Sequence, residues 1–161
     1  MKTLTTICFT LFLGLVFWAC SEKKDPKMEE AGKIHLAAME VEEAIAKEIE
    51  QSDSLKNLLS EKKKTLKDAA LIAQIDSAVV SLDQVHKAFH EWQENLVEVP
   101  GLPHEHHHHG EGEGHHHHDH KPAPDLTPDQ MLEVQREIKA NIEKIKADWD
   151  RAKETAQKLL Q

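Results

Sequence analysis

The chain has 161 residues and a formal net charge of −9, with 29 acidic residues against 20 Lys and Arg. That length is sufficient for one modest domain with a buried core. An acidic chain without a basic patch is a poor binder of nucleic acid, so we exclude nucleic acid as a partner and expect the protein to attract cations.

The first 19 residues are typical of an export signal. Met1-Lys2 is positively charged, and the apolar stretch Leu4–Ala19 is shorter than the roughly 20 residues that a membrane-spanning helix needs. The stretch ends at Ala19-Cys20-Ser21, which resembles a bacterial lipoprotein signal cut before a lipid-carrying cysteine. Phe17-Trp18 departs from the usual residues of that signal. An ordinary secreted protein and an uncleaved anchor are the alternatives.

Cleavage before Cys20 changes the chain in two ways. Removal of 19 of the 161 residues leaves 142, with 19 basic against 29 acidic residues and a net charge of −10. Cys8 leaves with the signal, and a lipidated Cys20 has no thiol for a disulfide, even in an exported setting. We therefore predict lipidation at Cys20, with residues 20–27 as a linker.

Residues 28–99 are predicted to form a helical hairpin. No proline lies between Lys27 and Val99, and good helix formers dominate. Apolar residues recur at three- and four-residue steps in two segments, about 27–66 and about 69–97. Ser52-Asp53-Ser54 is the expected position of a break or kink in the first. The apolar seams are Ile34, Ala38, Val41, Ile45, Leu55, Leu59 and Leu66, then Ile72, Ile75, Val79, Leu82, Val85, Phe89, Trp92 and Leu96.

A third helix is predicted from Pro128 to Leu160, within a segment 127–161. Thr127 and Gln130 match a capping box, and Leu126 and Met131 are spaced as a hydrophobic staple. Its seam is Met131, Val134, Ile138, Ile142, Ile145, Trp149, Ala152, Ala156 and Leu159. Because no amphipathic helix buries its stripe alone, we predict an all-α fold, an up-down-up antiparallel three-helix bundle.

Residues 100–126 are predicted to be a long disordered loop that binds metal. Ten of the seventeen residues from 104 to 120 are histidine, the commonest protein ligand for zinc, nickel and copper. The predicted ligands are His104, His106, His107, His108, His109, His115, His116, His117, His118 and His120, with Glu111, Glu113 and Asp119 as secondary ligands. Three glycines leave the backbone free to fold around an ion. The alternatives are a purification tag, which normally sits at a terminus, and a merely solvated loop.

Signals of catalysis are weak. The sequence has no nucleophile elbow, phosphate-binding glycine loop or dinucleotide fingerprint. The stretch 104–108 matches the letters H-E-x-x-H, but it follows Leu102-Pro103 and runs into glycine, whereas a zinc-protease motif needs a helix. We therefore do not expect an enzyme.

Three histidines lie outside the loop. His86 and His90 are four residues apart on the second helix, a spacing at which two imidazoles can hold one ion, and we name them as secondary metal ligands. The alternative is two half-buried histidines that flank Phe89. A hairpin turning near Lys67 would bring His35 close to the Pro100 end of the second helix.

Several stretches together resemble a known group of proteins. The lipoprotein signal, the acidic helix beginning at 33–35 (Lys-Ile-His) and the run 82–92 are similar to small helical lipoproteins of Gram-negative bacteria. The resemblance implies a helical bundle on a lipid anchor and carries no established activity. The histidine-rich loop sets this chain apart from that group.

The leading hypothesis is a lipid-anchored outer-membrane protein of a Gram-negative bacterium that buffers, captures or hands over divalent transition ions. Zinc or nickel is favoured and copper is allowed. The alternative is a structural or interaction lipoprotein with an incidental loop, whose helices bind an envelope protein through an exposed apolar stripe anchored by Trp92 or Trp149. A third hypothesis is a pH-responsive module, because protonation of all 13 histidines would move the net charge from −10 to about +3.

Overall fold

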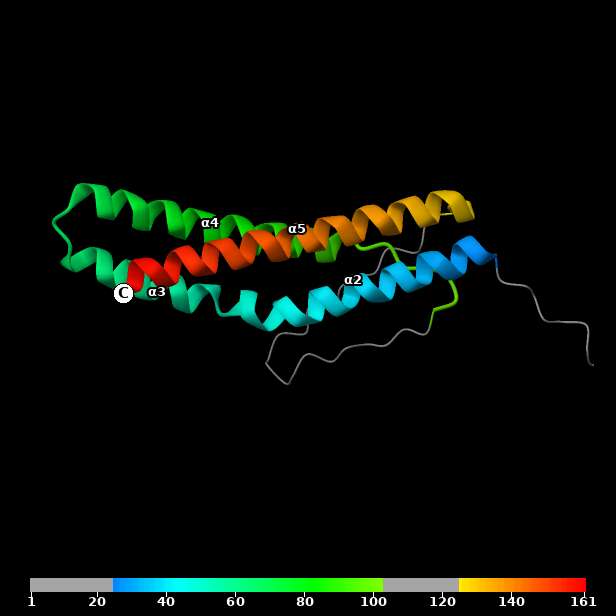
Figure 1. Ribbon diagram of the computed structural model, residues 1–161, viewed down its shortest axis with the longest axis horizontal. Helices are drawn as coiled ribbons and strands as arrows, with labels where there is room; N and C mark the ends of the chain where they lie inside the picture. Colours follow the sequence, from blue (N-terminus) through cyan, green and yellow to red (C-terminus); the bar gives the residue numbers. More distant parts are fainter. Residues whose placement is uncertain (1–24, 103–124) are drawn as a thin grey trace, which may run out of the picture.

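The computed structural model describes residues 25–102 and 125–161. These residues form four helices and no strand, which confirms the all-α class (Figure 1). The helices are α2 (Pro26–Glu50), α3 (Ser52–Thr65), α4 (Ala69–Glu94) and α5 (Pro128–Leu160). The predicted signal peptide, Cys20 and the ten loop histidines lie outside the described residues.

The helix starts follow from capping residues. In α5 the predicted capping box is present, with the Gln130 amide donating to Thr127 Oγ1 and Gln130 Oε1 accepting from the Thr127 amide at 3.0 Å. Leu126 and Met131 lie in one apolar cluster, as the staple predicted. At α4 the cap is Asp68, whose carboxylate accepts from the amides of Ala70 and Leu71.

The predicted first helix is two helices. The break falls at Gln51, directly before the Ser52-Asp53-Ser54 stretch at which a kink was expected. The amide of Gln51 bonds to Glu48 O at 3.1 Å, so the last turn of α2 closes tightly before α3 begins. Ser52 is fully buried there, and its hydroxyl has no hydrogen-bond partner.

Cross-helix pairs define the directions of the helices. The pairs Lys27–Asp129, Glu30–Arg136 and Glu48–Lys153 ascend together along α2 and α5, so these two helices run parallel. Between α3 and α4, the later residue of α3 pairs with the earlier residue of α4, as Lys63–Asp76 and Lys56–Asp83 show. These two helices therefore form an antiparallel hairpin. In Figure 1, α5 lies alongside α2 over one half of its length and alongside α3 and α4 over the other.

The main core is built from the predicted seams. Ile75, Leu82, Phe89, Ile142 and Trp149 are all buried in one cluster with residues of α2 and α3. Both buried indoles also donate hydrogen bonds, Trp92 Nε1 to Ile138 O at 2.9 Å and Trp149 Nε1 to Glu48 Oε2 at 3.0 Å. The tryptophans are therefore core residues, and the expectation that one of them anchors an exposed stripe is wrong.

A smaller core closes the end at which α2 and α5 begin. It consists of Ala31, Val99, Met131 and Leu132, with partly buried side chains that include Leu102 and Leu126. A Cβ at Gly32 would lie 3.2 Å from Leu102 Cδ2, so the glycine allows this close approach. The two residues that flank the histidine segment thus pack into the same small core.

Segment 95–102 takes the place of a helix at this end. The second helix was expected to reach about Val97 but ends at Glu94, where Asn95 caps it and donates from Nδ2 to Glu91 O at 2.7 Å. Beyond this cap the carbonyl of Val97 accepts from Gln135 Nε2. A turn follows, in which the Leu102 amide bonds to Val99 O at 3.3 Å. Pro100 and Gly101, with φ +81°, suit the two central positions of a type II turn.

Ile142→Asp tests the seam of α5. Ile142 is fully buried, so an unpaired carboxylate there should lower the free energy of unfolding by about 3 kcal/mol or more. Urea denaturation followed by circular dichroism measures the change. The neighbouring exposed change Asn141→Asp is the control and should stay within about 0.5 kcal/mol of the parent. Equal midpoints for the two variants would contradict the burial of this face.

Candidate functional site

His35 lies against segment 95–102, as the hairpin geometry predicted. Its Nδ1 donates to Gln135 Oε1 at 3.1 Å, and Gln135 Nε2 donates to Val97 O at 2.6 Å. Gln135 is fully buried. This chain of two hydrogen bonds joins α2, α5 and the segment that leads towards the histidine run.

The His35 site favours the neutral imidazole. Burial lowers the pKa of His35 from its usual 6.5, and the hydrogen bond to Gln135 and the charge of Glu98 oppose this only in part. His35 therefore works as a neutral donor at pH 7. It holds the polar bridge between α2 and α5.

His86 and His90 share one face of α4. Their ring centroids are 4.6 Å apart with an interplanar angle of 72°. His86 is half-buried and His90 is exposed, while the Phe89 between them is in the core. The pattern of two half-buried histidines is thus wrong for His90, and the predicted proximity of the two rings is confirmed.

A charged cluster from α3 and α4 surrounds His86. Lys56 Nζ lies 2.7 Å from Asp53 Oδ1 and 2.6 Å from Asp83 Oδ1, and so it bridges the two helices. The pKa of His86 is lowered by burial, then by His90 and Lys56, while Asp53 and Asp83 oppose the shift. This cluster was not predicted from the sequence. Asp53 and Lys56 come close to the histidines only because α3 and α4 form a hairpin.

The helical body holds no ready-made metal cage. In the part of the chain that the structure describes, no three His, Cys, Asp or Glu side chains are placed to bind one ion together. Glu91 pairs with Lys87 at 3.5 Å, and both residues are one position further along α4 than the two histidines. The two imidazoles of α4 are therefore a two-ligand set.

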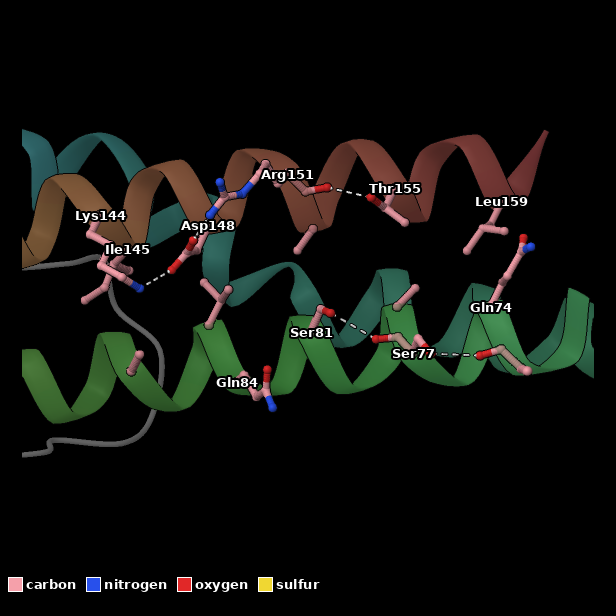
Figure 2. A pocket seen from close by; sticks show the side chains of 15 residues that line it. Gln74, Ser77, Ser81, Gln84, Lys144, Ile145, Asp148, Arg151, Thr155 and Leu159 are labelled. Atoms are coloured by element: carbon pink, nitrogen blue, oxygen red, sulfur yellow. Dashed lines mark hydrogen bonds and ion pairs between the residues drawn. The ribbon is translucent and has the colours of Figure 1, made fainter. Parts of the chain in front are cut away.

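A groove runs between α4 and α5, with a volume of about 820 Å³ (Figure 2). Its floor includes the buried side chains of Ala78, Val85 and Ile145. Figure 2 shows the hydroxyls of Ser77 and Ser81 bonded within their own helix, to the carbonyls of Ala73 and Ser77 at 3.0 Å each. These hydroxyls do not require an external partner.

The charged rim of the groove is also internally paired. Asp148 accepts from Lys144 Nζ at 2.8 Å and from the guanidinium of Arg151. The groove therefore has an apolar floor and a rim of paired charges. This surface suits packing against another apolar surface.

The burial of two polar residues was not predicted from the sequence. Gln135 and Glu42 occupy seam positions, each three residues before a core isoleucine, and both are buried. Gln93 Nε2 donates to Glu42 Oε1 at 2.8 Å. Both are polar residues at positions where the helical repeat calls for apolar ones, and this exception could have identified them from the sequence.

Within residues 25–102 and 125–161, no helix combines the length and apolar character that crossing a membrane requires. Comparison with protein-family models, with curated proteins and with solved structures finds no match to this chain. The function is therefore inferred from the residues of this chain alone.

His35→Gln tests the buried neutral imidazole. Because the folded pKa of His35 lies below 6.5, the unfolded chain binds more protons as pH falls through 6.5, and stability falls with it. The unfolding free energy of the parent should therefore decrease from pH 7 to pH 5.5, and the variant should show a smaller decrease. Urea titrations at both pH values measure this.

Glu48→Gln is the control for that experiment. The pKa of Glu48 is lowered from 4.5 by its bonds to Lys153 and Trp149, so its stabilisation is present above 4.5 and is lost only at lower pH. The Glu48 variant should keep the parental slope between pH 7 and 5.5. A His35 variant with that same slope would show that the imidazole titrates equally in both states.

Proposed function

We propose that this protein is a lipid-anchored envelope protein that binds divalent transition ions through the histidine-rich segment 104–120. In this proposal an up-down-up antiparallel bundle, with α2 and α3 together as its first arm, carries the segment between α4 and α5. The ions would be buffered or handed over, with zinc or nickel favoured and copper allowed. The ten imidazoles within seventeen residues are the observation that carries the proposal.

The described residues on either side of the histidine-rich segment support the proposal. Leu102 and Leu126 both contact the small core around Val99 and Met131, so the chain leaves and re-enters the body at one place. The two described core clusters are built from apolar side chains of the helices and of segment 95–102. In this proposal ion uptake and release would proceed without unpacking of the helices.

The same end of the body faces the proposed anchor. Lys27 of α2 pairs with Asp129 of α5, so the start of α2 lies beside the start of α5 and near both flanks. Cys20 precedes Asp25 by five residues, a span of at most about 18 Å. A lipid on Cys20 would therefore keep the histidine segment close to the membrane surface.

The groove between α4 and α5 favours a second candidate function, an interaction lipoprotein. Its apolar floor and internally paired rim fit a helix or an apolar loop of an envelope protein. The two candidates are separable because the groove shares no residue with segment 104–120. A groove variant such as Ser81→Arg should block a partner and leave metal binding unchanged.

Metal binding by the loop is tested by replacing both four-histidine blocks, residues 106–109 and 115–118, with serine. The parent should bind more than one Zn²⁺ or Ni²⁺ per chain, because ten imidazoles exceed the four that one tetrahedral zinc needs. The variant should lose most sites. Equilibrium dialysis with elemental analysis measures the stoichiometry. Binding to the parent should weaken sharply as pH falls through about 6.5, because protons compete for the same nitrogens.

A chelator separates a buffering site from a structural one. The helicity and melting temperature of the parent should not change when metal is removed, because the described core is held together by apolar side chains. A chain that binds no ion at neutral pH, or that keeps a stoichiometric ion through chelation, would overturn the proposal.

Cys20→Ala tests the anchor. The variant should remain unprocessed or detach from the membrane fraction, because the lipid-bearing thiol is absent. Ser21 rather than aspartate follows the cysteine, and so we expect the parent in the outer membrane. Fractionation and mass spectrometry of the mature amino terminus measure both outcomes. A Cys20→Ala protein that still fractionates as a mature membrane protein would contradict lipidation.

A further inference from the structure

The histidine pair of α4 has a spacing that one metal ion can use. His86 and His90 lie one helical turn apart, with ring centroids separated by 4.6 Å. An ion bound by two imidazole nitrogens at about 2.1 Å, with roughly 100° between the bonds, separates the ring centroids by about 5 Å. Rotation about χ2, which is broad for histidine, can direct one nitrogen of each ring to a common point without moving the backbone.

The site is accessible from solvent yet held by the body. His90 is exposed, and His86 is half-buried where α3 packs on α4. Two core residues, Val85 directly before His86 and Phe89 directly before His90, fix the orientation of the helix. The entropy lost on binding is therefore confined to two side chains, whereas a long loop must order its backbone as well.

The charges around His86 act in opposite directions on a bound cation. Asp53 and Asp83 contribute two negative charges, and the ammonium of Lys56 between them contributes one positive charge. The side chain of Lys56 is only 20% exposed, so its charge stays at this position. The carboxylates draw a divalent ion towards the pair, and Lys56 opposes it.

We propose that His86 and His90 form a second, independent site for one divalent transition ion, and that Lys56 limits its affinity. This site extends the proposed metal-binding function from the histidine segment to the helical body. Water would complete the coordination, because no third protein ligand is in place among the described residues. A site of this kind exchanges its ion readily, which suits a transfer point.

The ligand chemistry selects the ion class. Imidazole nitrogen suits zinc, nickel and copper, whereas Mg²⁺ and Ca²⁺ prefer oxygen ligands. Affinity rises from nickel to copper for a fixed nitrogen set. Ni²⁺ is the probe for titration, Cu²⁺ is the probe for spectroscopy, and Mg²⁺ is the negative control.

The experiment uses the full chain with all ten histidines of segment 104–120 replaced by serine. This background should bind one Ni²⁺ per chain by calorimetry, and Cu²⁺ should show electron paramagnetic resonance couplings from two imidazole nitrogens. His86→Ala and His90→Ala should each abolish the two-nitrogen signal. His35→Ala should leave it unchanged, because His35 is engaged with Gln135. Circular dichroism checks that each variant is folded.

Charge variants test the role of Lys56. Lys56→Gln should lower the dissociation constant for Ni²⁺ about three-fold or more, because a positive charge that acts on His86 is removed. Asp53→Asn together with Asp83→Asn should raise it. Lys87→Gln is the matched control, since Lys87 is on the same helix but pairs with Glu91, and it should have the smallest effect.

A thermal readout gives an independent check. Ni²⁺ should raise the melting temperature of the background in proportion to its occupancy, and should not raise that of the His90→Ala variant. Absence of Ni²⁺ binding in the background, or binding that survives either alanine change, overturns this proposal. A Lys56 effect no larger than that of Lys87 overturns the role of Lys56.

The companion variant, with segment 104–120 intact and both His86 and His90 replaced by alanine, reports on the loop alone. Several ions on this variant together with none on the serine background would leave the proposed function standing and remove the second site. The reverse result would remove the loop function and keep the second site.

Discussion

Burial of one long stripe on α5 is the constraint on which the rest of the structure depends. The stripe extends from Met131 to Leu159 on α5, a helix of 33 residues and about 50 Å, whereas α2 and α4 have only 25 and 26 residues. No single neighbour can cover it. α2 covers its first part, the α3–α4 hairpin covers its second, and segment 95–102 fills the place that α4 leaves. The break at Gln51 lies between the first two of these coverings.

Polar groups inside this packing are satisfied by one another. Gln135 links His35 to the Val97 carbonyl, Gln93 bonds to Glu42, and the two indoles donate to a carbonyl and a carboxylate. A buried polar group without a partner costs stability, so each pair also selects one register between its helices. Ser52 is the exception among the described residues. We find no physical account of its unbonded hydroxyl.

The two proposed metal-binding sets differ in physical character. A histidine run offers many interchangeable coordination states, so it favours capacity over a defined geometry. The pair on α4 has one spacing, set by a helical turn, and its local field is set by Lys56 and two carboxylates. In the proposed function, the segment would supply capacity close to the proposed anchor, and the pair on α4 would supply a weaker fixed site on the body.

The sequence by itself determined the helices, because helix period, caps and chain breaks are local. The seams of α4 and α5, the Thr127–Gln130 capping box and the start of α5 were all readable from spacing. The proximity of the His86 and His90 rings was also readable from spacing, because a single helix sets it. Tertiary structure decided everything that joins distant segments. It joined segment 95–102 to α5 through the bond from Gln135 to Val97, placed Lys56 between Asp53 and Asp83, and buried Trp92 and Trp149. Periodicity shows which face of a helix is buried but not which partner covers it, and these contacts depend on the partner.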